Sequence, residues 1–120
     1  MDEQQKQNLR DCGISIEPAL ARFMDKDDMY LKFLKKFLYE NKNISGLEAG
    51  VEQQDVKSAF ACAHSMKGVA ANLGLDNVNE KLIPIVEILR KDSLEGVQDR
   101  MPGFVGQIER VKAVCEQCGF

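Results

Sequence analysis

Apolar residues recur at spacings of three and four along most of the chain, and no segment alternates apolar and polar residues with period two. The first spacing is typical of amphipathic helices, whereas the second would indicate β-strands. We therefore predict an all-helical protein. The most regular pattern is near the C-terminus, where spacings of three and four follow one another through Leu94, Val97, Met101, Phe104, Ile108, Val111, Cys115 and Cys118.

The pattern divides the chain into one short helix and four long ones. The short helix is predicted at residues 16–23, with Pro18 in its first turn, where proline is tolerated. The long helices are predicted at residues 27–52, 55–73, 76–91 and 93–118, and we expect Asp55 and Ser93 to cap the second and the fourth. Four long helices with short connections favour an up-down antiparallel four-helix bundle with a short additional N-terminal helix.

Two places in this pattern predict irregular helices. Asn41–Gly46 contains poor helix formers, so a bend or a break is expected there in an otherwise single helix. Pro84 removes one backbone hydrogen bond of its helix and predicts a kink. The first twelve residues are polar and show no packing pattern, so we predict a tail at residues 1–12 and a helical domain at residues 13–120.

The composition of the 120-residue chain is that of a single globular domain, with 44% hydrophobic and 29% charged residues. A net charge of -3 offers no basic surface for nucleic acid or an anionic membrane, so we expect neither as a partner. The N-terminus lacks the apolar core of a signal peptide, and Leu82–Leu89 is too short to span a bilayer. We therefore expect a cytoplasmic protein. We expect four lysines either to lie on a solvated helix face or to steer a partner to the protein: Lys32, Lys35, Lys36 and Lys42.

The four cysteines are most simply buried, reduced thiols. Cys62 lies on the predicted apolar stripe of its helix, and Cys115 and Cys118 extend the stripe of the last helix. A C-x-x-C pair without a second ligand pair is weak evidence for a metal or a redox site. Cys12, near the N-terminus, is not informative.

The helix predicted at residues 55–73 carries the only histidine of the chain, His64. Its apolar stripe consists of Val56, Ala59, Cys62, Ala63, Met66, Val69, Ala70 and Leu73. On a helical wheel His64 lies roughly 180° from the middle of that stripe, so we predict that it faces solvent. Apart from two lysines, the residues that share its face are apolar or very small: Lys57, Phe60, Ala61, Lys67, Gly68 and Ala71.

Two residues one turn beyond His64 suggest a chemical role for this face. Gly68 costs about 1 kcal/mol relative to alanine in a helix interior, and its missing side chain would open space beside the imidazole. Lys67 would place an ammonium group close to the same ring, where it could neutralise an attached anion.

The run A-H-S-M-K-G-V-A-A-N-L-G around His64 resembles the signature of histidine-containing phosphotransfer (HPt) domains. In that family a histidine is followed by lysine at the third position, by glycine at the fourth and later by a small-residue segment ending in N-L-G. Upstream, Gly13–Phe23 resembles the family's short N-terminal helix and Asp55 the cap of its histidine helix, so the resemblance covers residues 13–118. The matching positions of the signature are His64, Lys67, Gly68, Asn72, Leu73 and Gly74.

The resemblance implies reversible phosphorylation of the His64 imidazole by an aspartate-bearing receiver domain or a kinase, and onward transfer to another receiver. It also implies the same four-helix bundle, with the histidine exposed on the second long helix. The sequence has no P-loop, no kinase-type glycine loop and no carboxylate cluster around His64 for magnesium. We therefore expect a phosphoryl carrier rather than an enzyme, without a cofactor in this chain and with Mg²⁺ in the partner receiver.

The expected partners are response-regulator receiver domains and a sensor or hybrid histidine kinase, bound by a monomer. Exposed apolar clusters mark interaction sites. A low-relief docking patch is therefore predicted from Lys57, Phe60, Ala61 and Ala71, beside Gly68. Asn72 matches the family signature, although its role could equally be hydrogen bonding at the helix end.

Two other classes of protein stay open at this point. One is a helical adaptor that binds receivers or kinases without transferring phosphate, which the intact His64 counts against. The other is a metal or redox protein that uses Cys115, Cys118 and Cys12.

Overall fold

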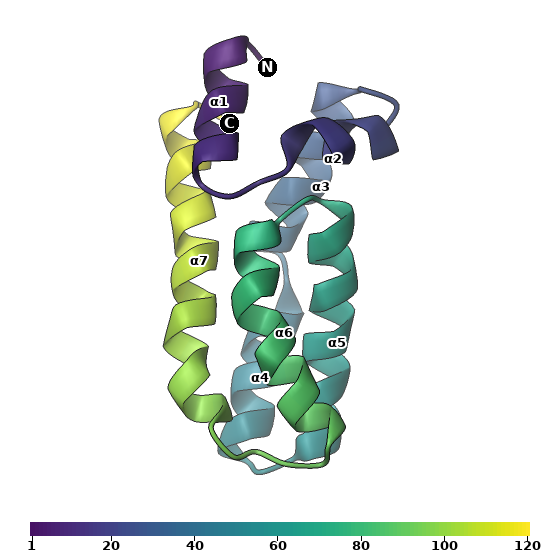
Figure 1. The fold of residues 1–120 in the computed structure, drawn as a ribbon, viewed down its shortest axis with the longest axis vertical. Helices are drawn as coiled ribbons and strands as arrows, with labels where there is room; N and C mark the ends of the chain where they lie inside the picture. The colour runs from purple at the N-terminus through teal and green to yellow at the C-terminus, as the bar shows by residue number, and fades with distance from the viewer.

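The computed structural model describes all 120 residues, in seven α-helices and no β-strand. Four columns run antiparallel to one another, with α3 and α4 end to end in one column and α5, α6 and α7 in the others (Figure 1). At one end of the bundle, α1 contacts α7 and α2 contacts α3. The predicted up-down bundle is confirmed. The helices are α1 (Glu3–Asp11), α2 (Ile16–Arg22), α3 (Asp27–Tyr39), α4 (Lys42–Glu52), α5 (Val56–Asn72), α6 (Asp76–Arg90) and α7 (Val97–Gln117).

The segment predicted as one helix at residues 27–52 consists of two helices. Asn41 caps α4, because its side-chain oxygen accepts a hydrogen bond from the backbone N–H of Asn43 at 2.9 Å. A capping asparagine stabilises a new helix start. The prediction of one continuous helix was therefore wrong, and the break lies at the start of the stretch where a bend or a break was expected.

The glycines of α4 allow this helix to pack closely on α5. A Cβ added to Gly50 would lie 2.9 Å from the backbone nitrogen of Ala59, and one added to Gly46 would lie 2.7 Å from the sulfur of Cys62. Real Cβ atoms do not approach other atoms so closely, so larger residues would push the helices apart. The poor helix formers in this segment therefore serve helix packing.

The helix α5 begins and ends where the sequence predicts. Asp55 accepts a hydrogen bond from the backbone N–H of Ser58 at 3.1 Å and so satisfies an amide of the first turn. Beyond the other end, Gly74 has a φ of +71°, and a side chain there would lie 2.6 Å from the carbonyl oxygen of Ser15. Glycine is required here both by the left-handed backbone and by the nearby start of α2.

Side chains from two other helices hold the C-terminal end of α5. Arg22 of α2 donates hydrogen bonds to the carbonyl oxygens of Ala71 and Asn72, at 3.1 and 3.0 Å. The hydroxyl of Tyr30 in α3 donates to the carbonyl oxygen of Leu73 at 2.8 Å. Burial raises the pKa of Tyr30, so this hydroxyl remains a donor. These bonds satisfy carbonyl groups that have no partner within the helix.

The last two helices differ from the prediction at one boundary. α6 continues through Pro84, but α7 begins at Val97 rather than beside Ser93. Ser93 accepts a hydrogen bond from the N–H of Glu95 within the loop, and Gly96 interrupts the helical path with a φ of +79°. The cap predicted at Ser93 was therefore wrong. The predicted inner face of α7 is confirmed, because its buried residues are Val97, Phe104, Ile108, Val111 and Cys115.

The first residues of the chain form a packed helix, whereas the sequence predicted a polar tail. Asp2 and Gln5 form a capping box at the start of α1. Leu9 is fully buried, and Gln5 donates a hydrogen bond to the carbonyl oxygen of Cys118 at 2.9 Å. A single apolar residue cannot show a helical period in the sequence, which is why the packing of α1 was missed.

One continuous core of buried apolar side chains runs through the bundle and includes residues from all seven helices. The inner face predicted for α2 is confirmed, since Ile16, Leu20 and Phe23 are buried. None of the helices combines the length and the apolar character needed to cross a lipid bilayer.

Candidate functional site

His64 lies on the outer face of α5 and its side chain is exposed, as the helical wheel predicts. The opposite face of the same turn is anchored in the core, since Ala63 and Met66 are at most 1% exposed. The imidazole is therefore presented to solvent from a rigid helix rather than from a loop, which suits a reactive group that needs a defined position.

The imidazole of His64 stacks on the ring of Phe60, one turn earlier in α5. The two ring centroids are 5.4 Å apart and the ring planes differ by 29°. This separation is typical of favourable aromatic pairs. Phe60 is half-buried and packs against the core, so the imidazole lies on a ring that is itself anchored in the bundle.

Arg90, in the last turn of α6, completes this arrangement. Its guanidinium carbon lies 5.2 Å from the centre of the Phe60 ring, a cation–π distance. Glu87, on the same helix, pairs with Arg90 at 3.4 Å. The contact of Arg90 with Phe60 was not predicted from the sequence. The sequence does contain one indication of this contact. Phe60 and Arg90 lie equally far along the chain from Leu75, on either side of the turn between two helices predicted to run antiparallel.

The turn after His64 offers a cation and open space. Lys67 is half-buried, whereas Gly68 is exposed, and a Cβ added to Gly68 would meet no atom within 4 Å. The position of Gly68 is therefore open, and the clearance role of this glycine beside His64 stays a prediction. Asn79 of α6 donates a hydrogen bond to the backbone carbonyl of Lys67 at 3.2 Å and thereby ties α6 to this turn of α5.

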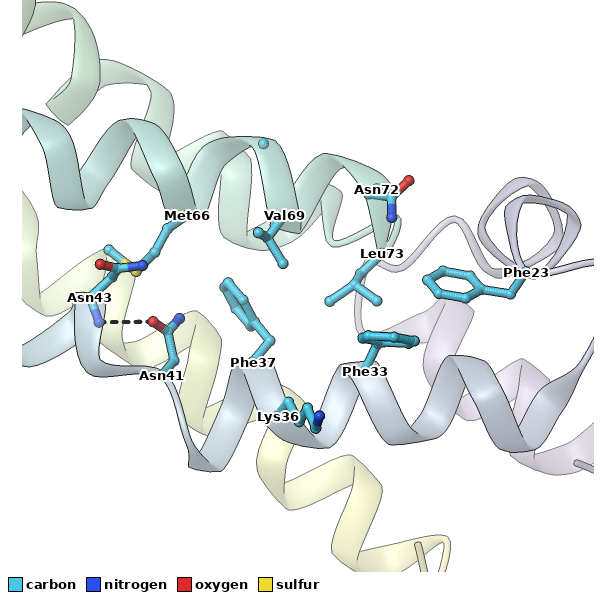
Figure 2. A pocket seen from close by; sticks show the side chains of 11 residues that line it. Phe23, Phe33, Lys36, Phe37, Asn41, Asn43, Met66, Val69, Asn72 and Leu73 are labelled. Carbon is cyan, nitrogen blue, oxygen red and sulfur yellow. Dashed lines mark hydrogen bonds between the residues drawn. The ribbon is translucent and has the colours of Figure 1, made fainter.

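On the other side of α5, a groove of about 550 Å³ separates it from α3, and Gly68 forms part of its wall. Figure 2 shows the phenyl rings of α3 facing Val69 and Leu73 of α5, with the amide side chains of Asn41, which precedes α4, and of Asn43 in α4 at one end. The groove is mostly apolar. Its lining consists of Phe23, Phe33, Lys36, Phe37, Asn41, Asn43, Met66, Gly68, Val69, Asn72 and Leu73.

Two large apolar residues of this groove are exposed. Phe33 is 43% exposed and Val69 is 45% exposed. Val69 was predicted on the buried stripe of α5, and that prediction was wrong. Because Val69 lies in the wall of the groove between α3 and α5, no neighbouring helix covers it. The phenyl rings that α3 contributes to the lining of the groove were not predicted from the sequence.

The residues predicted for docking lie along the exposed side of α5. Lys57, Ala61 and Ala71 are exposed and Phe60 is half-buried. Asn72 is exposed and its side chain lines the groove, while its backbone carbonyl accepts the hydrogen bond from Arg22. The lysines that precede this surface on α3 and α4, Lys32, Lys35, Lys36 and Lys42, are all exposed as predicted.

The four cysteines are free thiols. Cys12 and Cys115 are buried, and burial raises the pKa of both, that of Cys115 to about 12, so they stay protonated at neutral pH. Cys62 and Cys118 are half-buried, although Cys62 was predicted on the buried stripe. No three histidine, cysteine or acidic side chains converge in a way that could hold a metal ion. The cysteine-based metal site therefore finds no ligand set.

The comparisons with known proteins agree with this geometry. The family model described as Hpt domain matches residues 19–117, a range that includes His64 and both flanks of the site. No match to the chain was found among curated proteins or among solved structures. Hpt domains are in general phosphocarriers rather than enzymes, and they interact with receiver domains and kinases. The chain therefore belongs to the Hpt domain family, whose members have phosphotransfer-related roles in two-component signalling.

Proposed function

We propose that His64 is the phosphoacceptor of a phosphorelay. It takes a phosphoryl group from the aspartate of a receiver domain, or from a kinase, and passes it to another receiver. The observation that carries the proposal is the exposed imidazole on a rigid helix, with no atom within 4 Å of the Cβ position at Gly68. A phosphoryl group and the partner that delivers it both need that space.

The transfer step needs only a nucleophile from this chain. One nitrogen of the neutral imidazole has a free lone pair, which forms a bond to phosphorus. The bond between phosphorus and the aspartyl oxygen breaks, and its electron pair leaves with the carboxylate. The proton on the other ring nitrogen stays there or passes to water. The reverse sequence delivers the group to the next receiver.

Charge on the transferred group is balanced by both proteins. Lys67 is one turn from His64 and offsets negative charge on the phosphoryl oxygens. Phosphoryl transfer depends mainly on alignment and electrostatic stabilisation. We assign the remaining cation, Mg²⁺, to the receiver, in keeping with the carboxylate chemistry expected there.

The receiver docks over the groove between α3 and α5 and over the adjoining face of α5. Phe33 and Val69 supply exposed apolar surface there, and Lys36 adds a positive charge at the same place. Large exposed apolar side chains rimmed by polar ones are typical of interaction sites. The groove reaches the reactive turn through Gly68, so a partner seated in it lies beside His64.

The test is phosphoryl transfer from purified, labelled receivers to the wild-type protein and to His64→Gln. We expect acid-labile label on the wild type and none on the variant, whose circular dichroism spectrum should be unchanged because His64 is exposed. Label on the folded variant would contradict the assignment. Receiver binding to the wild type without any transfer would instead indicate a non-transferring adaptor.

A further inference from the structure

Phe60 is in contact with two groups of very different chemistry. The imidazole of His64 stacks on its ring with centroids 5.4 Å apart, and the guanidinium carbon of Arg90 lies 5.2 Å from the same ring centre. The phenyl side chain has no atom that can donate or accept a conventional hydrogen bond. Phe60 can therefore act on its two neighbours only through apolar contact and through the π-face of its ring.

Stacking has a direct consequence for the imidazole. A ring that lies on Phe60 has one face covered, and rotation about its side-chain bonds would break the contact. The ring nitrogens lie in the plane of the imidazole, so their lone pairs and N–H bonds point away from the covered face. A fixed ring gives the reactive nitrogen a constant direction of attack, which lowers the cost of alignment.

Arg90 is held close to this ring although it has an acidic partner of its own. Glu87 is 3.4 Å from Arg90 on α6, yet the guanidinium group still lies over the ring of Phe60 on α5. The contact therefore connects the end of α6 to the histidine face. It places a cation of α6 against the ring on which the imidazole stacks, in the turn of α5 before His64 rather than in the turn of Lys67.

We propose that Phe60 is a positioning residue of the phosphotransfer site, which orients the His64 imidazole by stacking and keeps the positive charge of Arg90 beside it. This inference rests on the phosphoacceptor role proposed for His64. Through its contact with Phe60, Arg90 adds a positive charge from α6 to that of Lys67 on α5, and both charges favour the negative charge of a phosphorylated imidazole.

The experiment separates positioning from docking by using two phosphoryl donors. Phosphoramidate is a small donor that needs no protein interface, whereas a phosphorylated receiver needs both docking and alignment. The variants are Phe60→Leu, which removes the π-face, and Phe60→Tyr, which keeps it. Arg90→Gln and Arg90→Lys test the charge. Tyr39→Leu is the matched control, because Tyr39 forms a comparable cation–π pair with Lys112 at 5.3 Å without a histidine.

We expect Phe60→Leu to slow labelling by phosphoramidate by about threefold to tenfold. This range is the change in rate that corresponds to the interaction free energy of one aromatic pair. Phe60→Tyr should stay within about twofold of the wild type, as should Tyr39→Leu. Arg90→Gln should slow labelling by about twofold to threefold, and Arg90→Lys by less. The effect of Arg90→Gln should disappear in the Phe60→Leu background, since the two residues act as one unit.

Two results would overturn the inference. If Phe60→Leu slows transfer only from the receiver, mainly through KM, the residue docks the partner and does not position the ring. If Arg90→Gln has the same effect with and without Phe60, the cation acts independently of the stack.

A readout without phosphate keeps this inference distinct from the proposed function. The imidazole protons of His64 should show a ring-current shift in the NMR spectrum that is lost in Phe60→Leu and retained in Phe60→Tyr. If the wild type takes no phosphoryl group from any receiver, the proposed function fails, while the NMR result still decides whether Phe60 orients the ring. An unshifted wild-type spectrum would refute the stacking itself.

Discussion

The two flanks of His64 differ in chemistry. Toward α6, two polar or charged side chains approach this part of α5: Asn79 bonds to the backbone of Lys67, and Arg90 lies over Phe60. Toward α3, the neighbours form an apolar groove in which Val69 is largely uncovered. We therefore extend the proposed function to a division of labour, in which one flank would handle the charge of a small transferred group and the other would provide contact area for a protein.

This comparison also explains why a single helix face carries both tasks. Electrostatic stabilisation of a phosphoryl group requires charges near one atom, whereas binding a protein requires apolar area spread over several residues. Gly68 lies between the two flanks, because it follows Lys67 directly and also lines the groove. Experiments that disturb one flank at a time should therefore separate binding from chemistry.

The largest effect is expected on the α3 flank. Val69→Glu places a charge in the apolar groove, and we expect receiver binding to weaken by at least about tenfold, since burying an unpaired charge at an interface is costly. Labelling by phosphoramidate should not change. Titration calorimetry with a receiver measures the first quantity and radiolabelling the second.

The matched control for this variant is Ile83→Glu. Ile83 is also an exposed apolar residue, at 40%, but it lies on α6. Equal losses of receiver affinity in the two variants would mean that the α6 flank docks the partner as well, and the division proposed above would be lost.

Gly68→Gln tests the point where the flanks meet. The long side chain should enter the open space beside His64 and slow transfer from receivers by about fivefold or more, through misalignment of the reacting groups. The helix should become more stable by about 0.5 to 1 kcal/mol, because glycine is unfavourable in a helix interior. Gly106→Gln on α7 is the control, since its Cβ position is equally open and lies outside the site. An unchanged transfer rate in Gly68→Gln would refute the clearance argument.

A smaller effect is expected from Lys67→Gln on the charged flank. Removing one partly exposed cation should slow phosphorylation by about threefold with either donor, a modest electrostatic contribution. The effect should shrink in high salt, where charges are screened. Rates measured for Lys81→Gln, an exposed lysine of α6, provide the baseline. If Lys67→Gln slows only transfer from the receiver, Lys67 contributes to docking rather than to the chemical step.

The smallest effect on phosphoryl transfer is expected at the end of α5. Arg22→Gln removes the donor to the carbonyl groups of Ala71 and Asn72, so we expect a loss of about 1 kcal/mol in the free energy of unfolding. Urea denaturation measures it, with Arg100→Gln as the control for loss of an exposed arginine. Phosphoramidate labelling should be unaffected. A large change in labelling would show that the end of α5 also positions His64.

The prediction of α5 succeeded because its determinants are local. The repeat of apolar residues lies within α5, and Asp55 and Gly74 lie just outside its two ends. A helical period of 3.6 residues places His64 opposite the buried stripe without reference to any other element. The start of α4 was harder to predict. The weak helix formers were visible in the sequence and predicted a bend or a break, but they do not say which of the two occurs or at which residue a new helix starts.

The sequence alone determined the helical class, the bundle and the exposed histidine with its lysine and glycine. Each of these follows from the spacing of residues along the chain. Only the tertiary structure decided that Arg90 reaches Phe60 and that Val69 remains uncovered. Both depend on which neighbouring helix lies against α5 and where that helix ends. A periodic pattern says which side of a helix is apolar, but the packing of its neighbours decides how much of that side is buried.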